Sequence, residues 1–372
     1  MTRTSVLVGG LILAVSMGAG WIEGADQEVR ARLGMLLERN AAEGVFSGVA
    51  LVADASGVIL QEGYGYANLE WNIPNTPEVR YRVGSISKQF TAAVVMKLVD
   101  EGALSLDSTL TELLPWYRAD TGSQVTIRQL LNHTSGIDRS GVPRMIAEHS
   151  CCPMPLLEEV TNYCSGDLEW QPGSKFAYNN AGYLILGAVI EEATGVTYAE
   201  ALQEKILAPV GMKNTGLDDP SVVLPRRAAG YDLTDEGIRT PSFVHATLAS
   251  SAGGVYSTVG DLFLWDRALD SDDILAESTR REMFTPGLGD YGYGWFIMDM
   301  PVGPDHAVRS VIRHPGQGDG FRSIFWRIPE DEITIILINN VGKPSLATMA
   351  EGILDVLHGN ETVAGEALSE AS

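Results

Sequence analysis

Residues 85–99, Ser85-Ile86-Ser87-Lys88 followed by QFTAAVVMKLV, decide how the rest of the chain can be arranged. The run from Gln89 to Val99 is apolar on nearly every side, which is typical of a helix surrounded by other parts of the protein. Ser85 and Lys88 are three residues apart, so they share one face of a helix that begins near Ser85. We therefore predict a central helix whose first turn carries a serine and a lysine.

The S-x-x-K pattern also predicts a nucleophile. A serine hydroxyl reacts only after a base takes its proton, and a lysine removed from water loses basicity and can accept that proton. The N–H groups at the start of the helix would face any oxyanion formed at Ser85. For the tetrapeptide alone, a helix-capping serine with a solvent-facing lysine is the simpler interpretation. The buried helix that follows favours catalysis, because a charged Lys88 at its head needs a function.

Tyr178-Asn179-Asn180 is a second candidate motif, directly before an expected helix that starts at Ala181. A tyrosine near a lysine ammonium has its pKa lowered and can act as a base. Asn180 can hold both a substrate carbonyl and Lys88. A helix-capping asparagine and a packed tyrosine are the alternative interpretation.

His314-Pro315-Gly316, followed by Gln317, is the third candidate motif, in a strand-like region. A proline inside a strand predicts an edge or a bulge. A glycine beside it would let a substrate lie against the strand edge. The alternative for His314 is a surface histidine in a turn.

The order of the expected elements predicts the fold class. Strand-like runs lie at both ends of the chain, with helices between them, and Asp54-Ala55-Ser56-Gly57 is a hairpin signal. This order favours an α+β fold, an α/β sandwich in which one antiparallel sheet is built from both chain ends and flanked by helices, with a mostly helical lobe at about residues 85–260 inserted. We expect strands at 46–53, 57–66, 291–298, 307–313, 320–326 and 333–339, helices at 27–42, 107–117, 126–131, 181–194, 198–207, 261–269 and 344–357, and irregular chain at 136–176 and 221–250.

The three motifs, in this order, resemble those of the serine β-lactamase and penicillin-binding protein superfamily. The chain looks most like the branch that holds class C β-lactamases, serine D-Ala-D-Ala carboxypeptidases, D-amino peptidases and β-lactamase-like esterases. The similarity covers roughly residues 28–357. Supporting stretches are LLNHTSG at 130–136, PVGM at 209–212, AGGVYST at 252–258 and YGYGW at 291–295.

The resemblance implies a role for each motif residue. Ser85 would be the nucleophile and Lys88 its proton partner, while Tyr178 would act as a general base and then as an acid toward the leaving group. Asn180 would hold the substrate and Lys88. The backbone N–H groups of Ser85 and Gln317 would form the oxyanion hole. Acylation of Ser85 followed by hydrolysis is the implied path, with His314 and Gly316 beside the substrate.

The third motif departs from the common Lys-Thr-Gly. His314 is cationic only in part near neutral pH, and Pro315 has neither a hydroxyl nor an N–H group. Recognition of a substrate carboxylate should therefore be weaker, unless Arg313 or Arg322 supplies the charge.

Three functions follow. The first is an exported serine hydrolase that forms an acyl-enzyme at Ser85 and acts on esters or D-amino-acid peptides. The second is a class C-like β-lactamase, and the third is a non-catalytic penicillin-binding-like receptor. The intact residues Ser85, Lys88, Tyr178 and Asn180 argue against the receptor.

Composition restricts the partners. The chain of 372 residues carries 26 basic and 48 acidic residues, a net charge of -22, which argues against nucleic acid and anionic membranes. We expect a small-molecule or peptide substrate, no cofactor and no metal. The sequence leaves the oligomeric state open.

The chain ends predict export and processing. Arg3, the apolar run 6–19 and the small residues at 18–20 are typical of a signal peptide at residues 1–20, although an uncleaved anchor is an alternative. The protein would then be secreted or periplasmic, without stable membrane insertion. We expect a hydrolase domain at 25–358 and a disordered acidic tail at 359–372.

The three cysteines lie close together in the sequence. In an exported protein, Cys164 could form a disulfide with either Cys151 or Cys152, leaving one thiol over. Free thiols are the alternative. His149 nearby matches no common zinc spacing.

Overall fold

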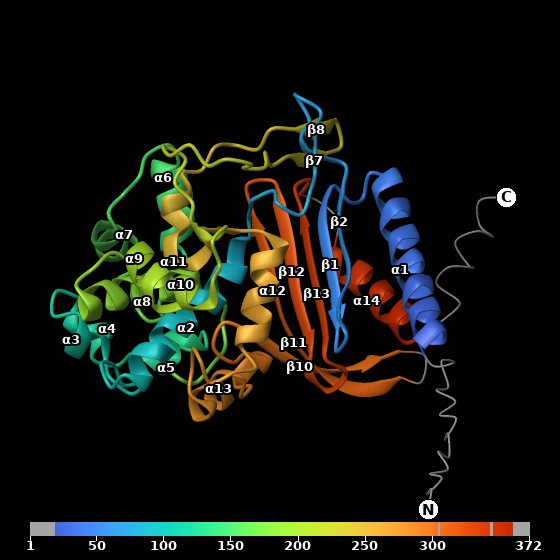
Figure 1. Ribbon diagram of the computed structural model, residues 1–372. Helices are drawn as coiled ribbons and strands as arrows, with labels where there is room; N and C mark the ends of the chain where they lie inside the picture. The colour runs from blue at the N-terminus through green and yellow to red at the C-terminus, as the bar shows by residue number, and fades with distance from the viewer. Residues whose placement is uncertain (1–18, 304–305, 343–344, 360–372) are drawn as a thin grey trace, which may run out of the picture.

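A six-stranded antiparallel sheet lies at the centre of the computed structural model, which describes residues 19–303, 306–342 and 345–359 (Figure 1). Strands from the two ends of the chain meet in this sheet, in the order β10-β11-β12-β13-β1-β2. Their bounds are Gly48–Asp54 for β1, Gly57–Tyr64 for β2, Phe296–Val302 for β10, Ala307–Gly318 for β11, Phe321–Ile328 for β12 and Ile333–Asn339 for β13.

The pairing of β1 joins the two halves of the sheet. β1 and β2 form the hairpin expected at residues 54–57, where Asp54 pairs with Gly57. On its other side, β1 pairs with β13, from Gly48 opposite Asn339 to Ala53 opposite Thr334. The predicted fold, an antiparallel sheet built from both chain ends, is therefore confirmed.

Both faces of the sheet are covered, which explains the nearly continuous apolar runs of β1 and β13. Alternate residues of a strand point to opposite faces. Val49 and Leu51 of β1 thus join the core shared with the helical region, whereas Ala50 and Val52 join the core on the other face. Helices α1 and α14 cover that second face, and α12 packs on the first (Figure 1). These helices span Ala19–Ala42 (α1), Val259–Ala268 (α12) and Leu346–Leu357 (α14).

A mostly helical region lies beside the sheet, with α2 and α8 packed together inside it (Figure 1). Its helices are α2 (Ser87–Asp100), α3 (Leu110–Leu113), α4 (Ala119–Gly122), α5 (Ile127–Leu131), α6 (Gly141–His149), α7 (Leu156–Tyr163), α8 (Asn180–Thr194), α9 (Tyr198–Leu202), α10 (Ala208–Val210) and α11 (Ser250–Gly253). The central helix is α2, in which every residue from Ser87 to Met96 is buried, as its apolar sequence predicts.

Short strands connect the helical region to the sheet. They are β3 (Tyr66–Asn68), β4 (Ile73–Pro74), β5 (Tyr81–Arg82), β6 (Gly216–Leu217), β7 (Asp232–Thr234), β8 (Gly237–Arg239) and β9 (Val255–Ser257). Strand β9 pairs with both β5 and β6, which places residues 81 and 82, just before Ser85, against the chain that follows α11.

The prediction that residues 136–176 are irregular is wrong, because α6 and α7 lie there. Prolines misled the prediction. Pro143 is the third residue of α6, and Pro155 is the N-cap of α7. The first N–H groups of a helix have no intrahelical partner, so a proline at its start breaks no hydrogen bond. Helix α13 (Glu277–Met283) was also not expected, and the expected helix 107–117 is only α3.

The predicted disulfide of Cys164 is not formed. All three cysteines are free: Cys164 is fully buried at the end of α7, whereas Cys151 and Cys152 are exposed, with their Sγ atoms 3.2 Å apart. Closeness in sequence did not bring Cys164 to the other two, because its side chain belongs to the main hydrophobic core.

The predicted signal peptide at residues 1–20 and acidic tail at 359–372 lie almost wholly outside the described residues. Within the part of the chain that the structure describes, no helix has both the length and the apolar character needed to cross a membrane.

Candidate active site

Ser85 lies in a 3-10 turn, Gly84–Ile86, that runs directly into α2. Gly84 adopts a φ of +55°, and a Cβ atom there would lie 2.5 Å from the backbone N of Gln317. Only glycine allows this approach without strain. Gly84 therefore brings the turn that carries Ser85 against β11.

The second serine of the motif, Ser87, has a structural role. Its hydroxyl donates to the Gly84 carbonyl (2.7 Å) and accepts from the Val255 N–H (3.0 Å). Both hydrogen bonds are buried, so Ser87 fixes the turn to β9. Of the two serines, only Ser85, which is half-buried, faces open space.

Gly316 is required by a backbone contact that the sequence did not reveal. A Cβ atom there would lie 2.0 Å from the Val83 carbonyl oxygen and 2.2 Å from Oγ of Ser323. Ser323 donates to that same carbonyl (2.8 Å). Close packing of residue 83 against the sheet is thus a reason for glycine in addition to the expected contact between a substrate and the strand edge, which stays a prediction.

Lys88 is fully buried and faces three acceptors. Its Nζ atom lies 3.2 Å from Oγ of Ser85, 2.9 Å from Oδ1 of Asn180 and 2.6 Å from the Ala252 carbonyl oxygen. Burial lowers the pKa of Lys88 to about 7. A neutral amine has two N–H donors. If these go to the two carbonyl-type oxygens of Asn180 and Ala252, the lone pair is left for the Ser85 hydroxyl.

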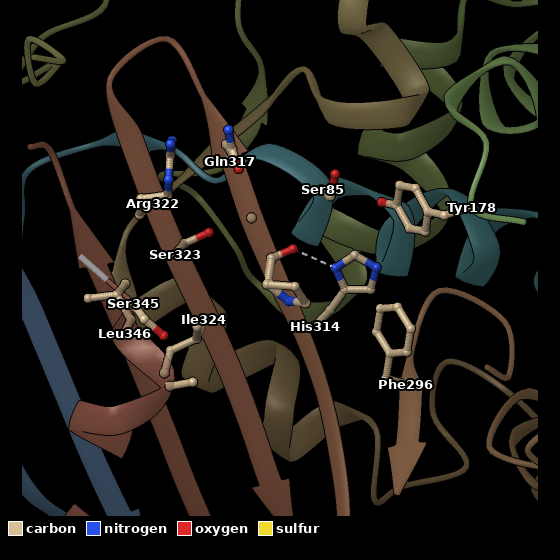
Figure 2. Close-up of a pocket in the computed structure, with 13 residues that line it drawn as sticks. Ser85, Tyr178, Phe296, His314, Gln317, Arg322, Ser323, Ile324, Ser345 and Leu346 are labelled. Atoms are coloured by element: carbon tan, nitrogen blue, oxygen red, sulfur yellow. Dashed lines mark hydrogen bonds between the residues drawn. The ribbon is translucent and has the colours of Figure 1, made fainter. Parts of the chain in front are cut away.

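Tyr178 contacts the same lysine, but its pKa differs from the prediction. Lys88 Nζ lies 4.8 Å from the centre of the tyrosine ring, and the Tyr178 hydroxyl points toward Ser85 (Figure 2). Burial nevertheless raises the pKa of Tyr178 above its usual range, although interaction with Ser85 lowers it in part. The expected lowering is therefore wrong: the cation does not outweigh the loss of water. The buried hydroxyl has no hydrogen-bond partner of good geometry among the described residues.

His133 holds Tyr178 and α8 in place. Its ring centre lies 4.3 Å from that of Tyr178, and its Nδ1 atom accepts from the Asn179 N–H (3.2 Å). Burial, Lys88 and His314 lower the pKa of His133 well below the usual value, so its ring is neutral. The Asn179 side chain caps α8 by accepting from the Ala181 N–H (3.0 Å). This capping leaves the neighbouring side chain, Asn180, available to Lys88.

His314 is neutral and buried, in contrast to the partly cationic side chain expected from the sequence. Burial and the nearby Lys88 lower its pKa to about 3. Its Nδ1 atom lies 2.7 Å from the Pro315 carbonyl oxygen and its Nε2 atom 3.0 Å from the Tyr291 hydroxyl. A proton on Nδ1 satisfies both contacts, because Tyr291 then donates to Nε2. Phe296 packs on the same ring, and the neutral His314 does not supply the positive charge that the lysine of Lys-Thr-Gly provides.

Pro315 lies at a strand edge, as expected. Strand β10 stops pairing with β11 at Arg313, while β12 pairs on through Gly318. A proline is tolerated at residue 315 if the N–H group that it lacks would point away from β12, because no hydrogen bond between the strands is then lost. Because this direction alternates along a strand, the Gln317 N–H points the same way, toward the turn that carries Ser85. The Gln317 N atom thus lies close to the turn that carries Ser85, as the 2.5 Å approach of a Gly84 Cβ atom to it also shows.

Two spaces adjoin Ser85. The outer groove has a volume of about 660 Å³ and wraps over the edge of β11 toward the start of α14 (Figure 2). Arg322 is the only charged side chain among the described residues that line it, beside Gln317. The inner pocket, of about 180 Å³, lies on the helical side of Ser85. The outer groove is lined by Ser85, Tyr178, Phe296, His314, Pro315, Gly316, Gln317, Arg322, Ser323, Ile324, Ser345, Leu346 and Ala347.

All seven residues singled out from the sequence thus meet at one site: Ser85, Lys88, Tyr178, Asn180, His314, Gly316 and Gln317. Sequence reasoning gave no role to His133, Ala252 or Tyr291. Each lies in a stretch that supported the family resemblance (130–136, 252–258 and 291–295), and this was the only signal available. A backbone carbonyl such as that of Ala252 leaves no mark of its function in the sequence.

Comparison with known proteins identifies the family. Residues 22–358 match the Beta-lactamase family. Penicillin-binding protein 4* of Bacillus subtilis is 26% identical over 340 residues, which cover 84% of this chain and 72% of that protein. The chain spans 62% to 72% of the length of the first curated relatives that it matches.

Solved structures agree. A penicillin-binding protein from Bacillus halodurans is 27% identical with a TM-score of 0.75, over 86% of this chain and 97% of that one. A D-stereospecific amidohydrolase from Streptomyces is 26% identical with a TM-score of 0.70, over 84% and 94%. The family match spans most of the chain, and this protein therefore belongs to the Beta-lactamase family, within the superfamily that includes penicillin-binding proteins, amidases and esterases.

Proposed function

We propose that this protein is an exported serine hydrolase that forms an acyl-enzyme at Ser85 and acts on esters or D-amino-acid peptides. The observation that carries the proposal is the environment of Lys88. Its amine is buried, its pKa is lowered to about 7, and its Nζ atom lies 3.2 Å from Oγ of Ser85. A buried amine near half-deprotonation at neutral pH is poised to take a proton from that hydroxyl.

In acylation, Ser85 Oγ forms a bond to the acyl carbon while its proton passes to Lys88. The N–H groups of Ser85 and Gln317 stabilise the oxyanion. The bond to the leaving group then breaks, and the Tyr178 hydroxyl supplies the proton that the leaving group needs. Lys88 returns its proton to Tyr178, and water repeats the sequence to release the acid and restore Ser85.

The neutral His314 supports an ester, or a peptide without a free carboxylate next to the scissile bond, over a β-lactam. A β-lactam carries a carboxylate, and the third motif offers it neither a cation nor a hydroxyl at residues 314 and 315. Arg322 supports the alternative, a class C-like β-lactamase, because its guanidinium lies in the outer groove.

A comparison of kcat/KM tests the proposal. The purified protein is given a short-chain nitrophenyl ester, a D-Ala-D-Ala peptide and a chromogenic cephalosporin, with Ser85→Ala as the control. Ester or peptide turnover that exceeds cephalosporin turnover by orders of magnitude supports it. Faster cephalosporin turnover would make the protein a β-lactamase. Absence of both turnover and covalent labelling of Ser85 would favour the non-catalytic receptor.

A further inference from the structure

The inner pocket is a mainly apolar cavity that opens at the nucleophile, with polar lining from Arg82, Ser85, Asn180, His245, Gln317 and Asp319. Its walls include Val142 and Ile146 of α6, Leu184 of α8, and Val244 and Leu248 from the chain before α11. Three of these five side chains, Val142, Leu184 and Leu248, belong to the main hydrophobic core. The wall is therefore held by the packing of the whole helical region.

The positions of Tyr178 and Asn180 distinguish the two spaces beside Ser85. Tyr178, which protonates the leaving group in the proposed reaction, lines the outer groove. Asn180, which holds Lys88, lines the inner pocket. Ser85 and Gln317 line both. A substrate whose carbonyl lies between Ser85 and Gln317 thus has its leaving group in the outer groove and its acyl group in the inner pocket.

The charged groups at the rim of the inner pocket neutralise one another. Arg82 pairs with Asp319, and its Nε atom lies 2.6 Å from a carboxylate oxygen of Asp218. Asp218 also pairs with Arg227 (2.8 Å), so two cations face two carboxylates. Among the described residues that line the pocket, Asp319 alone carries a carboxylate. Because Arg82 already pairs with it, no free carboxylate is left to bind a substrate ammonium.

The volume sets the size of the group. A dry protein cavity of about 150 Å³ lined by apolar side chains binds benzene, and the inner pocket has about 180 Å³. We infer that the acyl half of the substrate is an uncharged, apolar group of about six carbons without a free α-amine, held against Ile146, Leu184 and Leu248. This inference rests on the proposed function and names the acyl group that the function leaves open.

A series of 4-nitrophenyl esters tests the size. The acyl groups are acetyl, butanoyl, 4-methylpentanoyl, phenylacetyl, octanoyl and dodecanoyl. We expect kcat/KM to rise about fourfold per added methylene, the ratio that corresponds to about 0.8 kcal/mol per buried CH₂. The increase should stop near 4-methylpentanoyl and phenylacetyl, and kcat/KM should fall for dodecanoyl. Hydrolysis that depends on Ser85 but is fastest with acetyl or dodecanoyl overturns the inference and leaves the proposed function intact.

A matched pair of amides tests the charge. The 4-nitroanilides of 4-methylpentanoic acid and D-leucine differ only by the α-amine of the latter. With each rate divided by that of hydroxide-catalysed hydrolysis, we expect the uncharged amide to be preferred by at least tenfold, because no carboxylate offsets the loss of water by the ammonium. A preference for the D-leucine amide overturns the inference.

Variants of Ile146 locate the effect in the inner pocket. Ile146→Ala should move the optimum to a longer acyl group, and Ile146→Phe should move it to acetyl. Leu157→Ala is the control, because Leu157 is exposed on the neighbouring helix α7 and lines neither space. An optimum that does not move in either folded Ile146 variant places the acyl group elsewhere. Equal rates for the unaltered protein and Ser85→Ala on every ester would instead refute the proposed function.

Discussion

The Nζ atom of Lys88 lies 3.2 Å from Oγ of Ser85, at the end of a buried side chain whose other two hydrogen-bond partners among the described residues are carbonyl-type oxygens. Those two oxygens, from Asn180 and Ala252, come from α8 and α11, which are distant in sequence from α2. The proton-accepting power of Lys88 is thus produced by the packing of three helices.

Lys88 predicts the pH dependence of the reaction. Its pKa is lowered to about 7, and only its neutral form accepts the Ser85 proton. We expect kcat/KM to rise tenfold per pH unit below about pH 7 and to level off above it. The measurement is a pH profile with a neutral ester. A rate that keeps rising beyond pH 9 would instead assign the base to Tyr178, whose pKa is raised.

Removing the hydroxyl of Tyr178 should slow the reaction without unfolding the protein. Tyr178→Phe is expected to lower kcat by roughly 10²–10⁴, the usual scale for losing a proton-transfer group. The hydroxyl has no good hydrogen-bond partner, so the melting temperature should not fall. Tyr163→Phe, at a half-buried tyrosine of α7 that lies outside the site, is the control. An unchanged kcat in Tyr178→Phe would remove this residue from the mechanism.

Gly84 should be essential for the oxyanion hole. Gly84→Ala places a Cβ atom 2.5 Å from the Gln317 N atom at a φ of +55°, so the turn must move away from β11. We expect kcat to fall by at least about a hundredfold, as for loss of one oxyanion donor. Gly102→Ala has the same unfavourable sign of φ, +71°, but open space around its Cβ atom. It should lower stability slightly and keep full activity, and equal activity losses in both variants would contradict the prediction.

Glu159 should make the protein less stable as pH rises. Its carboxyl group is buried on α7, neither oxygen has a hydrogen-bond partner among the described residues, and burial raises its pKa from 4.5 to about 8. Between these two values the native state keeps a proton that the unfolded state has lost. The contribution of the protonated Glu159 carboxyl group to the free energy of unfolding is therefore complete below about pH 4.5, and it is lost as pH rises through about 8.

Glu159→Gln removes this titration. We expect its free energy of unfolding to exceed that of the unaltered protein increasingly from pH 5 to 8, by up to about 1.4 kcal/mol per pH unit. Denaturant unfolding at several pH values measures the difference. Glu158→Gln, at the exposed neighbouring residue, should show no such slope. Parallel stability curves for Glu159→Gln and the unaltered protein would show that the carboxyl group is solvated.

Thiol labelling should separate the cysteines by exposure. Cys151 and Cys152 are exposed, whereas Cys164 is fully buried and burial raises its pKa above the usual range. An alkylating reagent applied to the native protein should modify the first two, as detected by peptide mass mapping, and reach Cys164 only after unfolding. Rapid native labelling of Cys164 would contradict its place in the core.

The amino-acid sequence by itself determined the family, the sheet built from both chain ends and the seven residues that meet at Ser85. Periodicity and motif order carry this information, because the burial of α2 and the pairing of β1 with β13 follow from continuous apolar runs. Prolines at helix starts concealed α6 and α7, since a sequence does not show whether a proline begins a helix or breaks one.

Only the tertiary structure decided the protonation of the site. Proximity to Lys88 suggested a lowered pKa for Tyr178, but the pKa of Tyr178 is raised. An exposed histidine would be partly charged, but the buried His314 is neutral. The structure also showed that Gly316 is needed by the Val83 carbonyl and that an apolar cavity adjoins Ser85. The physical reason is the same in each case: the loss of water and the contacts of backbone groups depend on segments that are distant in sequence, and the folded chain alone brings them together.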